Sequence, residues 1–288
     1  MLQSYSFQPS DFEDVRQFFI RLNAADRKSM NWTWVRWEWM YFHPYFNRSL
    51  MDSIHLWKVG GEIVGIATYD QYFGEAFCGA LPSHRYLLPE IVDYAVGHLR
   101  DENGLGIPAN DEDADCIGLL QSMGFQKAGQ DDTIMRIPLD QPLSYTLPKG
   151  SSIHEIRLPS DRLAYKMMIW KGFDHEGDMQ ELQMMLDQTD DQPVHLNPQL
   201  CLAIANESGE FVAHCGCWYD AQTDYACIEP VCTIPSSRKL GLGRAVVSEA
   251  LNRSRALGAK EAFVGSNQVF YERLGFSSFT HFTYYWKK

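Results

Sequence analysis

The sequence predicts an α/β protein built from two copies of one unit, each a mixed, partly parallel, twisted sheet flanked by helices. The first observation is self-similarity at an offset of about 150 residues, the kind of period that marks a duplicated unit. The second is a pair of alternating apolar runs in each half, typical of a β-hairpin. The third is a helical pattern between neighbouring strands, which favours a partly parallel sheet. With 288 residues the chain is long enough for two ordinary domains.

Four pairs of segments match in the same order along the chain. The first pair carries Pro-Ser-Asp before a helical pattern, with the serine or aspartate as the expected helix cap. The second pair is the hairpin, with a Gly-Glu turn and a closing Tyr-Asp. The segments are Pro9–Asp11 with Pro159–Asp161, Ile54–Asp70 with Leu200–Asp220, Ala76–Arg85 with Ala226–Arg238, and Met123–Phe125 with Leu274–Phe276.

Each copy is expected to run through strand, helix or helices, hairpin, strand, loop, helix, strand, short helix and strand. No periodic pattern crosses the region that is punctuated by Pro138, Pro142, Pro148 and Gly150. The predicted organisation is therefore a first domain at 1–140, a linker at 141–150 and a second domain at 151–288.

The most informative stretch runs from Pro230 to Leu251 and reads as a buried strand, a tight loop and a helix. The loop contains two glycines, Gly241 and Gly243. Although the chain is acidic overall, the loop also carries the basic residues Arg238, Lys239 and Arg244. Unpaired N–H groups at a helix start, and the positive end of the helix dipole, form a cradle for anions such as a pyrophosphate. The Arg-x-x-Gly-x-Gly pattern differs from the glycine motifs of dinucleotide folds and nucleotide triphosphatases.

Val231–Gly243 resembles the acetyl-CoA signature of the GNAT N-acetyltransferase superfamily, and Ser266–Phe276 resembles that family's second signature. The order and spacing of the two signatures identify the chain as similar to a tandem GNAT protein, with two GNAT-like domains and a degenerate N-terminal copy. The resemblance implies acetyl-CoA as co-substrate. It also implies transfer of the acetyl group to a primary amine of a small molecule or peptide, by direct attack on the thioester.

The resemblance also assigns roles to residues of the second copy. Glu229 is the expected base for the protonated amine, and Tyr271 the expected acid for the departing thiolate. A strand-edge N–H near Cys232 would hold the oxyanion. Pro230 cannot donate to a ladder, which fits either a strand that leaves its neighbour or a strand at the edge of the sheet. The expected acetyl-CoA contacts are Val231, Cys232, Thr233, Arg238, Lys239, Leu240, Gly241, Leu242, Gly243, Arg244, Asn267 and Phe270.

Each assignment has a structural alternative. Glu229 can be a solvated strand residue, Tyr271 a core aromatic, and the basic residues ordinary surface charges. Two other functions stay open: a non-catalytic CoA-binding or regulatory module, and an acyltransferase that uses another acyl-CoA or a non-amine acceptor.

The first copy lacks the features that the second copy offers to a pyrophosphate. Arg85 aligns with Arg238, but Leu88, Pro89 and Glu90 stand where the second copy has its Gly241-x-Gly243 turn. Side chains, a missing N–H and a negative charge all oppose anion binding. Ala76 falls opposite Glu229, and Leu120 opposite Tyr271. This copy is expected to support or cover the second, or to form a dimer contact, so a homodimer is possible.

Composition excludes several classes of protein. The net charge of -12 argues against a nucleic-acid surface and is compatible with a cationic amine substrate. No apolar run approaches the roughly 18 residues of a membrane span, and no signal peptide is evident. Seven cysteines without a framework spacing predict free thiols and a reducing cytoplasm. Cys215 and Cys217 have no second pair at a zinc-finger spacing, so no metal is expected.

The aromatic segment Trp32–Phe46 has Trp34, Trp37 and Tyr41 on one helical face. Packing in the core or between domains is the favoured interpretation, and a wall of an acceptor pocket or a cage for a cation is the alternative. This segment and Trp170–Pro198 are the candidate acceptor regions, although neither carries a motif. His175, His195 and His214 are scattered, and no convergence among them is predicted.

Overall fold

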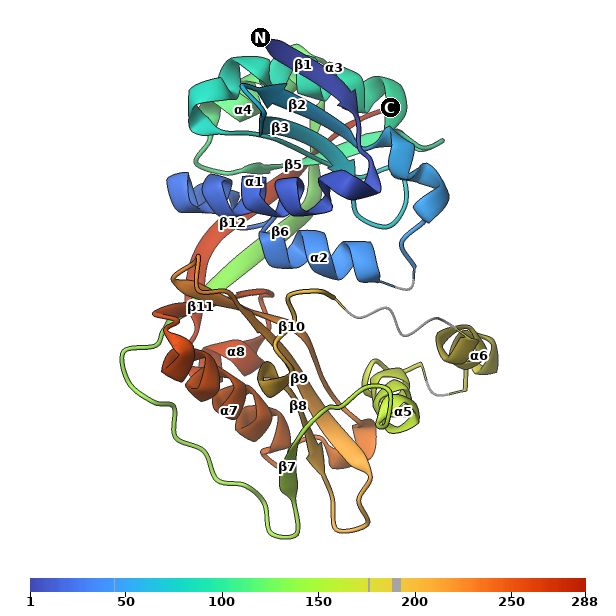
Figure 1. The fold of residues 1–288 in the computed structure, drawn as a ribbon, viewed down its shortest axis with the longest axis vertical. Helices are drawn as coiled ribbons and strands as arrows, with labels where there is room; N and C mark the ends of the chain where they lie inside the picture. The colour runs from blue at the N-terminus through green and yellow to red at the C-terminus, as the bar shows by residue number, and fades with distance from the viewer. Residues whose placement is uncertain (44, 176, 188–192) are drawn as a thin grey trace. The chain divides into compact units, whose positions relative to one another are not determined.

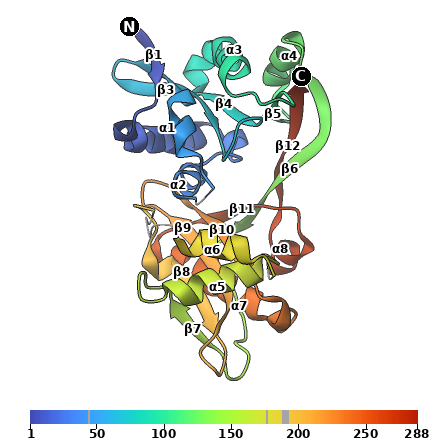
Figure 2. The same ribbon diagram turned by 90° about the vertical axis from the view of Figure 1, so that its right-hand side faces the viewer.

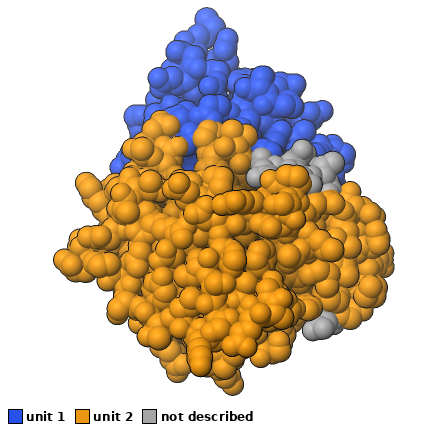
Figure 3. All heavy atoms as spheres, turned by 60° about the horizontal axis from the view of Figure 1, so that its bottom comes forward, with its two compact units in different colours: residues 1–135, 265–267, 278–288 blue, residues 136–264, 268–277 orange. Residues whose placement is uncertain are grey.

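The computed structural model describes residues 1–43, 45–175, 177–187 and 193–288. The chain divides into two compact units, coloured separately in Figure 3. Unit 1 comprises residues 1–135, 265–267 and 278–288, and unit 2 comprises 136–264 and 268–277. Strands β6 (Gln126–Pro138) and β12 (Ser277–Lys287) contribute residues to both units. The last strand therefore groups mostly with the unit formed by the first half of the chain.

Unit 1 contains an antiparallel sheet in the order β1-β2-β3-β4 (Figure 1). A further strand, β5, pairs antiparallel with β12 and meets β4 through a parallel bridge between Glu75 and Gly106. Helices α1 and α3 pack on β3. The elements are β1 (Leu2–Ser6), α1 (Phe12–Ala25), α2 (Trp34–Phe42), β2 (His55–Val59), β3 (Glu62–Tyr69), β4 (Ala76–Ala80), α3 (Leu88–His98), β5 (Leu105–Asn110) and α4 (Ala114–Ser122).

The predicted hairpins are confirmed in both units, but the predicted helix caps are wrong in detail. Asp11 and Asp161 precede α1 and α5 without capping them through their side chains. Their carboxylates instead accept N–H groups upstream: Asp11 from Gln8 at 2.9 Å and Asp161 from Arg157 at 2.8 Å. The Pro-Ser-Asp motif thus ties the incoming chain to the helix start.

The aromatic segment is part of the core of unit 1. Trp34 and Trp37 are fully buried, and Trp37 contacts the rings of Phe7 and Phe12 at 5.4 and 5.8 Å. Arginines also lie over some of these rings: Arg48 Cζ is 5.0 Å from the centroid of the Tyr41 ring. These contacts confirm core packing. Residue 44 of this segment lies outside the described residues.

Unit 2 contains a mixed sheet in the order β11-β10-β9-β8-β7. Strands β10 and β11 pair parallel, and the pairs from β10 to β7 are antiparallel. This is the partly parallel sheet that the sequence predicts. The elements are β7 (Ser152–Glu155), α5 (Arg162–Gly172), α6 (Met179–Asp187), β8 (Cys201–Ala205), β9 (Phe211–Tyr219), β10 (Tyr225–Thr233), α7 (Leu242–Leu257), β11 (Glu261–Gly265) and α8 (Val269–Leu274).

Helices α5 and α7 cover opposite faces of this sheet (Figures 1 and 2). Tyr165 of α5 meets the ring of His214 on β9, with 5.2 Å between centroids. The hydroxyl of Ser254 on α7 hydrogen-bonds the Cys217 thiol on the same strand. Because neighbouring strand residues alternate in direction, even-numbered β9 side chains face α5 and odd-numbered ones face α7.

The predicted linker is tied along α7. The N–H of Leu143 donates to Asn252 Oδ1 at 2.7 Å, and the Tyr145 hydroxyl donates to Glu249 at 2.8 Å. Across the part of the chain that the structure describes, no helix is long and apolar enough to cross a membrane.

Candidate functional site

Strand β10 leaves its parallel neighbour halfway along its length. Its register with β11 runs from Tyr225 opposite Glu261 to Cys227 opposite Phe263. Pairing with β9 continues to Thr233 opposite Ala213. Residues 231–233 are therefore paired through the β9 edge, and the other edge opens between β10 and β11. The departure that the proline predicts is confirmed.

The register identifies which N–H groups point into this opening. Ile234 donates its N–H to Val212 on the β9 side at 3.0 Å. Hydrogen-bonded pairs alternate along an antiparallel ladder, so Cys232 is also turned toward β9. Val231 and Thr233 are turned toward the open edge, and Thr233 O accepts the Nε–H of Arg238 there at 3.0 Å. The strand-edge N–H expected near Cys232 is thus that of Val231 or Thr233.

The Cys232 side chain is packed beneath α5. Its Sγ lies 4.0 Å from Met168 O, and a Cβ on Gly172 would come within 2.5 Å of it. Burial raises the pKa of the thiol to about 12, against a smaller opposing influence of Arg238. The thiol is therefore neutral and poorly reactive, which leaves the backbone as the useful part of this residue.

Glu229 lies at an irregularity of β10, where the register with β9 shifts between Ile228 and Val231. It is half-buried, and its backbone oxygen accepts the indole N–H of Trp218 at 2.7 Å. A bulge of this kind redirects a side chain out of the regular pleat. The carboxylate is thus presented just before the strand edge that opens.

The basic residues of the loop mainly brace their surroundings. Arg238 donates to O of Gly172, the last residue of α5, at 3.0 Å, and to Asp174 Oδ2, just beyond the helix, at 2.9 Å. Arg244 donates to Arg273 O at 3.0 Å. Lys239 is exposed and has a φ of 64°. The two arginines therefore hold the loop in place while their charge remains beside it.

The start of α7 has the geometry that the sequence predicts. Gly241 adopts a φ of +86°, and a Cβ there would meet nothing within 4 Å. The first helical bond joins Ala245 N to Gly241 O at 3.0 Å, so the N–H groups before it point out of the helix end. Leu240 is 60% exposed beside this end, whereas the Leu242 side chain is buried and belongs to the core.

Gly243 brings three elements together. A Cβ at this position would lie 3.3 Å from both the Phe270 ring and Thr233 Oγ1. The end of β10, the start of α7 and helix α8 therefore converge on one glycine. A ligand with its anionic group at the start of α7 would pass this glycine and then lie along the open edge of β10.

Tyr271 on α8 is 7% exposed and packs between two aromatic rings, Phe270 at 5.0 Å and Phe276 at 5.6 Å. Burial raises the pKa of its hydroxyl, and nearby Cys215 and Glu229 raise it further. The hydroxyl therefore keeps its proton at neutral pH, as a proton donor must. Because Glu229 is among the groups that raise this pKa, the two expected reactive side chains lie in the same part of unit 2, and their roles stay predictions.

Asn267 follows β11 and is exposed. It falls in the segment 265–267 that groups with unit 1, and its contact with acetyl-CoA stays a prediction.

Two residues of this site escape the sequence analysis. Gly216 lies directly under the backbone of Glu229, since a Cβ there would come within 2.5 Å of Glu229 O. Trp218 supplies the indole N–H to the same oxygen. The available signal is the glycine itself, because a glycine inside a strand marks a close backbone approach. The flanking cysteines draw attention to metal binding instead.

The corresponding positions of unit 1 are filled by the protein's own contacts. Arg85 forms a forked pair with Asp113, at 2.8 and 2.7 Å to the two carboxylate oxygens. Glu90, in the first turn of α3, accepts the indole N–H of Trp57 at 2.8 Å. A carboxylate thus lies at the helix start where the second unit offers open N–H groups.

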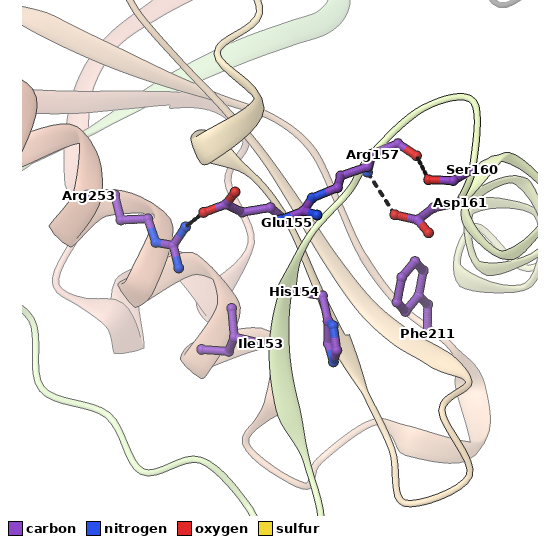
Figure 4. Close-up of a pocket in the computed structure, with 8 residues that line it drawn as sticks. All are labelled: Ile153, His154, Glu155, Arg157, Ser160, Asp161, Phe211 and Arg253. Atoms are coloured by element: carbon purple, nitrogen blue, oxygen red, sulfur yellow. Dashed lines mark hydrogen bonds and ion pairs between the residues drawn. The ribbon is translucent and has the colours of Figure 1, made fainter.

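A separate depression of about 530 Å³ lies beside the edge strand β7 (Figure 4). Arg253 pairs with Glu155 at 2.8 Å, and the Ser160 hydroxyl donates to Arg157 O at 2.7 Å. Most of the polar groups here thus bind one another, and none of the expected site residues is among those that line it. The lining is Ile153, His154, Glu155, Arg157, Ser160, Asp161, Phe211 and Arg253.

The cysteines and His214 of the site region are structural. All seven cysteines are described, and none of them forms a disulfide. Those on β8, β9 and β10 are buried: Cys201, Cys215, Cys217, Cys227 and Cys232. His214 is fully buried, with Nδ1 2.9 Å from Leu202 O, so Nδ1 carries the proton. Across the described residues, no group of three or more His, Cys, Asp or Glu side chains is arranged to hold a metal.

His214 predicts a loss of stability in mild acid. Burial lowers its pKa from 6.5 to about 4, partly opposed by the bond to Leu202. Below pH 6.5 the His214 imidazole binds a proton in the unfolded chain but stays neutral in the folded chain, so stability falls as the pH drops toward 4. At pH 5 this difference in proton binding lowers the free energy of unfolding by about 2 kcal/mol. The free energy of unfolding can be measured in urea at pH 7 and at pH 5. The difference between the two values should be smaller for His214→Gln than for the wild type. An equal difference would contradict the assignment.

Comparison with known proteins agrees with this geometry. Residues 164–276 match the family model for the acetyltransferase (GNAT) family. A GCN5-related N-acetyltransferase from Sphaerobacter thermophilus has a TM-score of 0.61 and 16% identity, over 99% of this chain and 95% of that chain. A tandem GNAT protein from the clavulanic acid biosynthesis pathway has a TM-score of 0.62 and 12% identity, over 99% and 98% of the two chains.

N-myristoyltransferase from Saccharomyces cerevisiae, solved with bound myristoyl-CoA, is also similar, with a TM-score of 0.55 and 11% identity over 99% of this chain and 78% of that chain. At these identities the similarity shows the fold. A search among curated proteins gives no significant match. Residues 164–276 therefore match the GNAT acetyltransferase family model, and the chain as a whole has the fold of tandem GNAT proteins.

Proposed function

We propose that this protein is an acetyl-CoA-dependent N-acetyltransferase whose second unit transfers an acetyl group to a primary amine of a small molecule or peptide. The observation that carries the proposal is the convergence of β10, α7 and α8 on Gly243, beside a strand edge that has left its neighbour. An open helix start suits a pyrophosphate, and an open strand edge suits the amide groups of a pantetheine arm. The residues present therefore fit acetyl-CoA.

The proposal assigns a role to each of the reacting groups. Glu229 takes a proton from the ammonium form of the acceptor, directly or through water, which frees the nitrogen lone pair. The N–H of Val231 or Thr233 stabilises negative charge on the thioester oxygen. Tyr271 gives its proton to the sulfur as the carbon–sulfur bond breaks. The second proton that nitrogen loses restores the Tyr271 hydroxyl through solvent, and the proton on Glu229 passes to bulk water. The products are the acetylated amine, free CoA and one proton. The buried, protonated hydroxyl of Tyr271 supports its role.

Two further expectations belong to this proposal. The free thiols support a reducing compartment such as the cytoplasm, and the degenerate unit remains a candidate dimer surface. A panel of amines with acetyl-CoA tests the reaction through release of free thiol. Binding without release would favour a non-catalytic CoA module, and faster release from another acyl-CoA would change the acyl donor.

The CoA cradle has a matched test in two glycines. Gly241 and Gly209 have φ values of +86° and +82°, and a Cβ on either would meet nothing within 4 Å. Gly241→Asp places a carboxylate in front of the α7 start, whereas Gly209→Asp places it in the β8–β9 turn. We expect calorimetry to give CoA affinity at least about tenfold weaker for Gly241→Asp, because like charges repel at this site. Equal affinities for both variants would rule out the cradle.

A further inference from the structure

The bulge of β10 at Glu229 rests on two residues of β9. Gly216 and Trp218 lie two positions apart on that strand, so they share the sheet face that α5 covers. A Cβ on Gly216 would lie 2.5 Å from Glu229 O and 3.1 Å from both Glu229 C and Pro230 Cδ. The backbone of Glu229 therefore occupies the space that a side chain at position 216 would need.

Trp218 fixes the carbonyl that sits in this space. Its indole N–H donates to Glu229 O at 2.7 Å, and the side chain is only 2% exposed. An indole N–H at this depth must find an acceptor, and a bulged carbonyl that leaves the regular ladder must find a donor. Each group satisfies the other, so one arrangement of the bulge is strongly preferred.

We infer that Gly216 and Trp218 form a carbonyl seat that sets the direction of the Glu229 carboxylate and makes both of them positioning residues for the reaction. The inference rests on the proposed role of Glu229. Gly216 provides the space and Trp218 the directional bond. With the carbonyl of Glu229 held on the α5 side, the side chain is limited to the orientations that this backbone allows.

The test compares Trp218→Phe with Trp37→Phe. Trp37 is also fully buried and donates its indole N–H to a backbone carbonyl, that of Phe12 at 3.2 Å, but it lies in the core of unit 1. We expect Trp218→Phe to lower kcat about tenfold or more with CoA affinity unchanged, because small misplacements of a catalytic group are costly. Trp37→Phe should leave kcat within about twofold, since it loses the same kind of bond away from Glu229.

A double-mutant cycle with Glu229→Gln separates positioning from general stabilisation. If Trp218 acts through Glu229, Trp218→Phe should have little further effect on kcat in the Glu229→Gln background. Equal losses of kcat in both backgrounds would overturn the inference. A wild type that binds CoA yet releases no thiol with any amine would instead count against the proposed function.

A crystal structure of Trp218→Phe tests the positioning of Glu229 independently of any activity measurement. We expect the Glu229 carbonyl to leave its place over Gly216 and the carboxylate to change direction. A bulge and carboxylate that coincide with the wild type would overturn the seat, whatever the kinetics show.

Discussion

Replacing Tyr271 with phenylalanine is expected to lower kcat by roughly 10²- to 10⁴-fold, the range typical of a lost general acid. The substitution keeps the ring, which contacts Phe270 at 5.0 Å and Phe276 at 5.6 Å, and removes only the hydroxyl. The CoA thiolate would then have to leave without its proton donor. CoA affinity should change less than about twofold, because the proposed CoA contacts of β10 and α7 remain. Steady-state thiol release and calorimetry measure the two quantities.

Tyr284→Phe is a suitable control for this prediction. Tyr284 is also buried, burial raises the pKa of its hydroxyl, and that hydroxyl donates to Asp132 at 2.9 Å in unit 1. Its loss should leave kcat nearly unchanged. If Tyr271→Phe turns over like the wild type, the acid role is wrong and Tyr271 is a core aromatic. The raised pKa of Tyr271 also means that its ionisation should not limit activity below about pH 10.

The parts of this fold that the sequence predicts well have local causes. Gly241 needs a left-handed backbone, and the helix that follows begins where its side chains start to alternate between core and solvent. The hairpins are set by their glycine turns and apolar alternation, with Gly60 and Gly61 at positive φ between β2 and β3. These signals lie within a few residues of the structure that they specify.

The features that the sequence does not reveal depend on distant partners. The pairing of β12 with β5 joins Lys287 to Leu105, and nothing near either residue encodes it. From the sequence, Arg238 is expected to bind phosphate. In the structure its guanidinium also donates to groups at and just after the end of α5. The match of Gly216 to the Glu229 backbone likewise requires the register of β9 against β10.

The first copy differs from the second in its side-chain contacts as well as in its loop sequence. Leu88, Pro89 and Glu90 remove the open helix start, which the sequence alone shows. The structure adds that Glu90 and Arg85 have new partners, Trp57 and Asp113. Replacing Glu90 with glycine would leave the buried indole N–H of Trp57 without this acceptor, and the Arg85–Asp113 pair would still hold Arg85. Unit 1 is therefore not one or two substitutions away from a phosphate cradle.

Glu229→Gln carries the second large expected effect, a fall in kcat/KM of roughly 10²- to 10⁴-fold at neutral pH. The variant keeps the backbone carbonyl that Trp218 binds, so the bulge should survive and only the proton acceptor is lost. A free amine has a pKa near 10, so a growing share of the acceptor arrives deprotonated as the pH rises. The ratio of wild-type to variant rates should therefore shrink steadily between pH 7 and 9.5.

Glu261→Gln provides the matched control for the loss of a carboxylate. Glu261 is half-buried at the paired end of β11 and forms an ion pair with Arg136 at 3.5 Å. Its removal should change kcat/KM by less than about threefold, with no dependence on pH, because it lies at the end of the strand pair that stays closed. If the two variants behave alike, or if the Glu229→Gln deficit stays constant across this pH range, proton removal from the amine does not pass through Glu229. In that case solvent deprotonates the acceptor before it binds, and the bulge of β10 serves only to open the strand edge.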